Sequence, residues 1–185
     1  MATKGFPFNS LKAIQAAAIL LGAERSWQMG YYRLLKLLYL ADRKHLKNTG
    51  RPILGGHAVA MDRGPLNSAV YDLIKQNHPD APLWGRYFHV SGRNIELLRA
   101  ASNGELSKKE IQTLLEVHGT YQECDDEEVG DATHGLPEYK GSYQKGTSTP
   151  IPLSAIIEAV GLGDLKEAIL EDAGEVAAMD RLFGG

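Results

Sequence analysis

The residues best suited to acid–base chemistry are an aspartate on an apolar helix face and a few histidines. Asp42 falls in the middle of the apolar arc of a predicted helix, and His45 follows it by one turn. A carboxylate in such a place needs an ion pair or hydrogen bonds. One interpretation is an acid in a cleft that acts with His45, Asp62 and His134. The other, which we favour, is an internal pair with an arginine or with backbone donors in the turn at residues 50–51.

Neither a metal site nor a covalent nucleophile is indicated. The six histidines at positions 45, 57, 78, 89, 118 and 134 include no pair with metal-ligand spacing on one helix. The single cysteine, Cys124, stands among acids, which disfavour a reactive thiolate. The sequence has no Gly-x-Ser-x-Gly motif, and Gly64-Pro65 makes a poor phosphate loop because proline has no N–H to donate. We therefore expect no metal, no cofactor and no enzymatic activity.

Length and composition indicate one ordered globular domain with a short appendage. The chain has 185 residues, a formal net charge of −3 and 43% hydrophobic residues. No apolar run approaches the roughly 18–20 residues that span a bilayer. The lone cysteine fits a reducing compartment, so we expect a soluble, cytoplasmic protein that does not contact membranes. The small negative charge gives no support for binding nucleic acid directly.

The charges are nevertheless segregated along the chain. Residues 33–51 hold six bases against one acid, whereas residues 123–131 hold six acids and no base. The segment 158–181 is also acidic. One interpretation is that these stretches face one another or solvent. The other is that they attract a protein partner electrostatically.

Periodicity predicts a mainly helical α+β fold, a compact helical domain around a central apolar helix with a small antiparallel β-sheet. The central helix is expected at 31–47, where apolar residues fill an arc of roughly 220°. Other helices are expected at 11–21, 68–76, 107–122, 126–134, 153–160 and 164–183, the last with Asp164 as its cap. Strands are expected at 57–61, 83–90 and 95–98, with a hairpin turn at 91–94. Residues 78–82 and 135–152 are expected to be loops.

Four blocks in fixed order resemble the Panacea domain of SocA-like antitoxins. They are residues 29–42, 50–53, 60–66 and 70–72. Residues 106–110 and 133–139 resemble the downstream blocks of that family, whose last position is more often tryptophan than the tyrosine found here. The resemblance covers about residues 11–139. We therefore expect a Panacea-like domain over 1–140, and a loop plus C-terminal helical extension over 141–185 that packs on it.

The resemblance implies an antitoxin, a role in phage defence, and a toxin partner encoded by the adjacent gene. Antitoxins of this family neutralise unrelated toxins by direct binding, including small alarmone synthetases and membrane-acting peptides. One member is an adaptor that delivers its toxin to a protease, so this remains an alternative, as does a small enzyme built around Asp42 and His134. Some members carry a DNA-binding module, which this sequence lacks.

For a binding protein, we expect the partner surface to combine charged and aromatic side chains. The first candidate is the basic side of the central helix, which we expect to be exposed. The next are the turn at 62–65, Tyr71, His134 and the loop 135–152, because long loops in compact domains are often functional. The final helix docks either on this domain, which we favour, or in a groove of a partner. The candidate residues are Arg33, Lys36, Arg43, Lys44, Asp62, Arg63, Gly64, Pro65, Tyr71 and His134.

Overall fold

The structure is a computed structural model that describes residues 5–184. Its helices are α1 (Ser10–Gly22), α2 (Tyr31–Thr49), α3 (Ser68–Ile74), α4 (Ala81–Trp84), α5 (Lys108–Tyr121), α6 (Asp126–His134), α7 (Pro137–Ser142), α8 (Leu153–Ala159) and α9 (Lys166–Phe183), with a 3₁₀ turn at Gly163–Leu165. Its strands are β1 (Gln28–Gly30), β2 (Ala58–Met61), β3 (Gly64–Asn67), β4 (Phe88–Ser91), β5 (Asn94–Leu97) and β6 (Thr149–Ile151). The predicted fold class, α+β and mainly helical, is confirmed.

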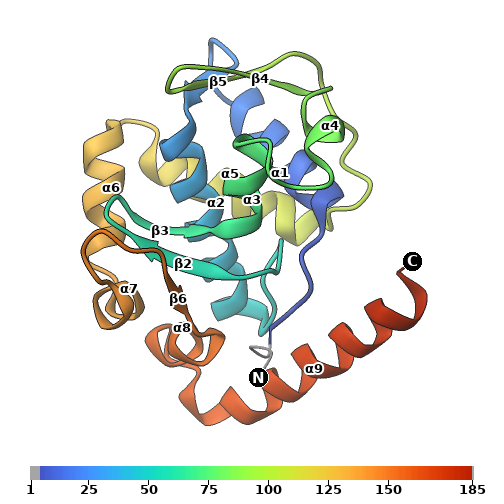
Figure 1. Cartoon of the computed structure of the whole chain (residues 1–185), viewed down its shortest axis with the longest axis vertical. Coiled ribbons are helices and arrows are strands. Elements are labelled where there is room, and N and C mark those ends of the chain that lie inside the picture. The colour runs from blue at the N-terminus through green and yellow to red at the C-terminus, as the bar shows by residue number, and fades with distance from the viewer. Residues whose placement is uncertain (1–4, 185) are drawn as a thin grey trace.

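Helix α2 forms the centre of the molecule, as its wide apolar arc predicts (Figure 1). Leu34, Leu35 and Leu37 are completely buried. Helices α1, α5 and α6 and strand β3 all pack on α2. Because neighbours surround it, even side chains outside the apolar arc are covered. The helix ends at Gly50, whose φ of 80° is the left-handed geometry that glycine adopts readily.

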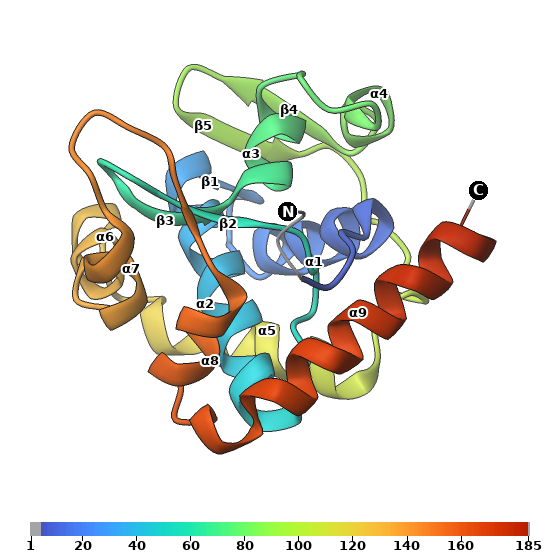
Figure 2. The same ribbon diagram turned by 60° about the horizontal axis from the view of Figure 1, so that its bottom comes forward.

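Two small antiparallel sheets flank α2, where the sequence predicted one. The first has the strand order β1-β5-β4, and its β4–β5 hairpin turns at the predicted residues 91–94. The second has the order β3-β2-β6. Strand β6 comes from far along the chain and pairs with β2, with Ile151 opposite Ala58 (Figure 2). A segment beyond residue 140 thus completes a sheet of the preceding part.

Several helix starts follow from local capping chemistry. The side chain of Asn9 accepts a hydrogen bond from the backbone N–H of Lys12 at the start of α1. Helix α5 begins with a capping box between Ser107 and Glu110, as predicted. Helix α6 has a second capping box, and its bounds agree with those predicted.

The predicted loop at 135–152 was wrong. It contains α7, which starts with Pro137 at its first position, and the strand β6. Helix α7 has only six residues and β6 three, so neither shows a hydrophobic period of its own. Both form because tertiary neighbours provide packing and, for β6, a hydrogen-bonding partner in β2.

Other short elements also differ from the prediction. The strand predicted at 83–90 is only β4, because its first residues belong to α4, which begins inside the predicted loop 78–82. Strands β1 and β3 were missed; β3 contains Pro65, which argues against a strand from sequence alone. Asp164 lies in the 3₁₀ turn and does not cap α9, which starts without a side-chain cap.

Helix α9 lies on the outside of the molecule, and its C-terminal end points away from it (Figure 1). Ile169 and Ala173 are buried, and Asp172 forms an ion pair of 2.6 Å with Arg51 at the end of α2. In contrast, Leu182 and Phe183 are 73% and 77% exposed. The first half of α9 therefore packs against the rest of the described chain, whereas its end does not. Across residues 5–184, we find no helix with the length and hydrophobicity needed to cross a bilayer.

Candidate functional site

Asp42 is held by backbone donors, one of the two arrangements expected. Its Oδ1 accepts hydrogen bonds from the N–H groups of Ile53, at 3.0 Å, and Leu54, at 2.9 Å. These donors follow the predicted turn at 50–51 by two or three residues. Burial raises the pKa of Asp42 to about 7, although both hydrogen bonds act to lower it. The carboxyl group thus fixes the chain that leaves α2.

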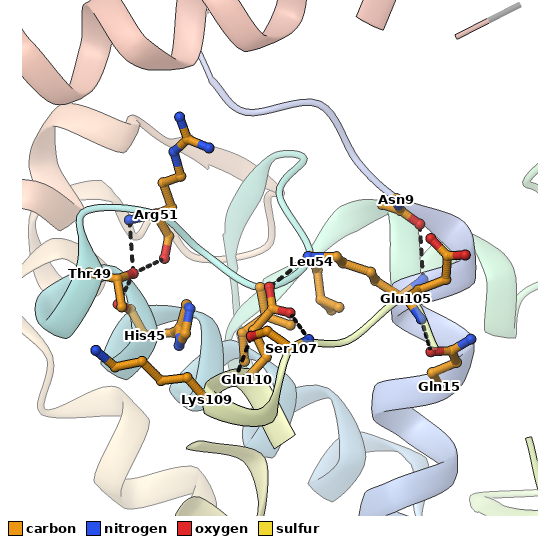
Figure 3. Close-up of polar contacts among 12 residues, drawn as sticks. Asn9, Gln15, His45, Thr49, Arg51, Leu54, Glu105, Ser107, Lys109 and Glu110 are labelled. Atoms are coloured by element: carbon orange, nitrogen blue, oxygen red, sulfur yellow. Dashed lines mark hydrogen bonds and ion pairs between the residues drawn. The ribbon is translucent and has the colours of Figure 1, made fainter. Parts of the chain in front are cut away.

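Polar contacts join the start of α1, the end of α2 and the start of α5 (Figure 3). Gln15 accepts a hydrogen bond from the N–H of Glu105, and Glu110 accepts one from the N–H of Ser107. Glu110 also pairs with Lys12 at 2.6 Å. Burial raises the pKa of Glu110, but Lys12 and Ser107 outweigh this and leave it below its ordinary value. These contacts hold α1 against the start of α5.

The four residues of the hypothetical enzyme site do not share polar contacts. Burial lowers the pKa of His45, whose Nδ1 contacts Thr113 of α5 at 3.2 Å. Asp62 and His134 belong instead to a cluster at the β2–β3 turn. Within residues 5–184, no three His, Cys, Asp or Glu side chains are grouped so that they could hold a metal ion. The geometry therefore gives the enzyme alternative no support.

Several residues of the β2–β3 turn form contacts with other parts of the protein that hold the turn in place. Asp62 Oδ1 accepts hydrogen bonds from the N–H of Gly146 and the hydroxyl of Tyr143, which lower the pKa of Asp62. The Tyr139 ring lies between the His134 and Tyr143 rings, with centroids 5.2 Å apart in both pairs. The hydroxyl of Tyr139 also donates to the carbonyl oxygen of Met61, so hydrogen bonds hold the turn against these stacked rings of α6 and α7.

Gly64 must be glycine in this turn. Its φ is 96°, and a Cβ there would lie 2.8 Å from Thr133 Oγ1 and 3.1 Å from the Lys36 ammonium. Pro65 is buried, and its carbonyl oxygen accepts a hydrogen bond of 2.8 Å from Lys36. Of the four turn candidates, Asp62, Gly64 and Pro65 thus have structural partners.

The expectation of an exposed basic side on α2 was wrong. Arg33 and Lys36 are 7% and 3% exposed. Arg33 donates hydrogen bonds of 2.7 Å to the carbonyl oxygens of Tyr121 and Cys124, at the end of α5. A guanidinium satisfies unpaired carbonyls there and interacts favourably with the helix dipole. Helices α5 and α6 cover the side of α2 that the sequence assigned to solvent.

The other two candidate bases of α2 are paired with acids. Arg43 donates to Glu138 of α7 at 2.6 Å, and Lys44 lies 2.8 Å from Glu116 of α5. The segregated charges also meet, since Arg33 lies 3.9 Å from Asp126 in the acidic stretch. Much of the charge asymmetry seen in the sequence is therefore neutralised inside the molecule.

One surface does combine exposed cations with aromatic rings; we call it the tyrosine patch. It consists of Tyr32, Arg63, Tyr71 and Lys75, grouped around Tyr31, which is only 4% exposed. The Arg63 guanidinium lies 4.6 Å from the Tyr32 ring centroid. The Lys75 ammonium lies 4.8 Å from the Tyr31 ring and 5.6 Å from the Tyr71 ring. Arg63 and Lys75 are exposed, and neither forms a salt bridge with a carboxylate in residues 5–184.

Neighbouring groups shift the pKa values of the polar groups in the patch. Lys75 Nζ donates a hydrogen bond of 3.1 Å to the Tyr31 hydroxyl, which raises the pKa of Lys75. Burial raises the pKa of Tyr31, but hydrogen bonds with Tyr32 and Lys75 lower it by more than burial raises it. The pKa of Tyr31 is therefore below its ordinary value. Burial and Tyr31 raise the pKa of Tyr32 to about 12. Lys75 thus remains a cation, and Tyr32 a neutral donor.

Sequence reasoning named Arg63 and Tyr71 but missed Tyr31, Tyr32 and Lys75. A usable signal exists for Lys75, because it follows Tyr71 by four residues and the two share a helix face. Tyr32 was assigned to the apolar core arc. Its half-buried ring instead supports Arg63 from the β2–β3 turn, a contact that only the tertiary fold creates.

Comparison with known families identifies the family of this chain, which the geometry alone does not. The family model described as "Antitoxin SocA-like, Panacea domain" matches residues 34–139, more than half of the chain. The chain belongs to this family. The match confirms the resemblance seen in the sequence. It includes Arg63, Tyr71 and Lys75 of the tyrosine patch, and Tyr31 and Tyr32 lie just before it. No curated protein and no solved structure matches the chain.

Proposed function

We propose that this protein is an antitoxin that neutralises a toxin protein by binding it directly through the tyrosine patch. The supporting observation is that two exposed cations, Arg63 and Lys75, lie on tyrosine rings and form no salt bridge with a carboxylate of the described residues 5–184. Arginine and tyrosine are enriched among residues that dominate protein interfaces. A complementary partner surface presents carboxylates to the two cations and an apolar area to the rings.

The patch suits binding because its geometry exists before a partner arrives. Tyr31 and Tyr32 are fixed at the first turn of α2, and their rings lie 4.4 Å apart. Arg63 stands on a turn that Asp62, Gly64 and Pro65 fasten to the core. Holding side chains in place lowers the entropy lost on binding. The toxin is the product of the adjacent gene in this proposal, and an enzyme of the alarmone-synthetase type is one suitable class.

Replacing Arg63 by alanine tests the patch. We expect affinity for the adjacent-gene product to fall by roughly 30-fold, as for a central interface arginine worth about 2 kcal/mol. Arg63→Ala combined with Tyr71→Ala is expected to abolish the rescue of growth when the toxin is co-expressed. Binding is measured by titration calorimetry with the purified proteins. Arg86→Ala is the matched control, because Arg86 is exposed, lies outside the patch and forms no salt bridge within the described chain.

Each outcome separates the alternatives. If the two proteins do not associate and growth is not restored, direct neutralisation is wrong. If they bind and Arg63→Ala binds as tightly as Arg86→Ala, the tyrosine patch is not the interface. If rescue depends on the toxin disappearing faster in cells that contain this protein, the protease-adaptor mechanism replaces a simple steric block.

A further inference from the structure

A cavity of about 260 Å³ lies beside the C-terminal half of α2. None of the residues of the tyrosine patch lines it. Its wall is formed by the N-terminal segment, α2, β2, β6 and α8. Most of the lining is apolar, including Phe6, Leu46, Ile151 and Ile156. At roughly 30 Å³ for each water-sized group, the space accepts a molecule of about eight non-hydrogen atoms.

One carboxyl oxygen at this cavity has no partner. Asp42 lines the cavity, and both of its backbone hydrogen bonds go to Oδ1. Oδ2 accepts no hydrogen bond from residues 5–184, and it is not among the fully enclosed side-chain atoms that lack one. It is therefore not fully enclosed, and Asp42 lines this cavity. A carboxyl oxygen in an apolar wall gains strongly from a donor, above all from a charged one.

Within residues 5–184, the charges nearby leave Asp42 without a counter-ion. Arg43 also lines the cavity, but its guanidinium is taken by Glu138 at 2.6 Å. The Lys12 ammonium is taken by Glu110, also at 2.6 Å. With each of these cations paired to its own acid, Asp42 contributes an unbalanced negative charge when ionised. Burial raises the pKa of Asp42 to about 7, and a cation at Oδ2 would bring that pKa back down.

We propose that this cavity binds a small organic cation, an ammonium group on a compact hydrocarbon body. The ammonium donates to Oδ2 of Asp42, and the hydrocarbon packs against Phe6, Leu46 and Ile156. Tyr39 adds a second polar group to the wall, since its hydroxyl donates to Glu138 and can accept from the ligand.

Binding at this place connects parts of the chain that are distant in sequence. Asp42 and Leu46 belong to the segment matched by the family model, whereas Ile151 and Ile156 lie beyond it. A ligand in contact with both sides holds β6 and α8 against α2. Occupancy therefore stabilises the association of the C-terminal segment with the rest of the protein.

The test uses 2-phenylethylamine as the probe, with 2-phenylethanol and phenylacetate as neutral and anionic molecules of similar size. Titration of the full chain, followed by amide NMR shifts, is expected to give a dissociation constant on the order of 1 mM or lower for the amine. The alcohol is expected to bind at least about tenfold more weakly, and phenylacetate not at all. Perturbed amides should include Ile53 and Leu54, whose N–H groups contact Asp42.

Two variants keep the proposal falsifiable. Asp42→Asn retains an oxygen for the Ile53 and Leu54 N–H groups and removes the charge, so the amine is expected to bind about tenfold more weakly. Ala58→Leu fills the cavity from β2 and is expected to prevent binding, whereas Ala132→Leu on the exposed side of α6 leaves it unchanged. Absence of any shift with the amine overturns the proposal. Equal binding of amine and alcohol, or unchanged binding by Asp42→Asn, overturns the role of the cation.

Discussion

Replacing Glu138 by alanine is expected to lower the free energy of unfolding by about 3–5 kcal/mol. The Glu138 side chain is completely buried, and it accepts hydrogen bonds from Arg43 at 2.6 Å and from the Tyr39 hydroxyl at 3.1 Å. The Arg43 side chain is itself only 20% exposed. Without Glu138, a guanidinium charge stays inside the protein with no carboxylate, and this costs far more than losing a surface salt bridge.

Denaturant unfolding of the single and double variants measures this cost. The double variant Arg43→Met with Glu138→Leu removes both charges, and it is expected to recover most of the stability lost by Glu138→Ala. Glu116→Ala is the matched control, because Glu116 forms an ion pair of similar length with Lys44 but is 43% exposed. A loss for Glu138→Ala no greater than that of the control would mean that the buried pair does not hold α7 against α2.

Local signals in the sequence predicted the parts of the fold that depend on neighbouring residues. The start of helix α5 was placed correctly because Ser107 and Glu110 form a capping box within four residues of each other. Helix α2 was placed because its apolar arc repeats over many turns. Strand β6 was missed because three residues carry no period, and only pairing with β2 makes them a strand.

The error about the basic residues of α2 has a different origin. Periodicity shows which side chains prefer burial, but it does not show whether another helix covers the remaining side. Arg33 and Lys36 have long apolar stems that pack in the interior, and their charged ends reach carbonyl oxygens. All three acceptors lie on segments distant in sequence, two of them at the end of α5 and one in β3. No pattern within α2 could have revealed them.

The tyrosine patch was predicted only in part from the sequence. Arg63 and Tyr71 were named because they stand in blocks typical of the family, and the structure places both in one patch. The residues that contact them are brought there by the packing of α2 against α3 and the β2–β3 turn. This packing also places Lys75 on the Tyr31 ring. The sequence therefore indicated a region of the surface, and the fold defines which side chains act together.

Lys36 gives the clearest expected dependence of stability on pH. Burial lowers its pKa from 10.5 to about 7, and its one hydrogen bond goes to the carbonyl oxygen of Pro65. Between these two values the unfolded chain binds a proton that the folded chain does not. Proton binding to the unfolded state opposes folding, so stability rises with pH across this window. Below about pH 7 both states are protonated, and the full penalty of burying the charge remains.

Lys36→Met removes this titration, and its effect is expected to change with pH. Near pH 7 the variant is expected to be more stable than the natural protein, since methionine buries no charge. That advantage should shrink by roughly 1.4 kcal/mol for each pH unit above about 7.5. Urea unfolding at a series of pH values measures the difference. Lys140→Met, a change at an exposed lysine of α7, should show no such slope. A difference between Lys36→Met and the natural protein that stays constant with pH would show that Lys36 keeps its proton in the folded state.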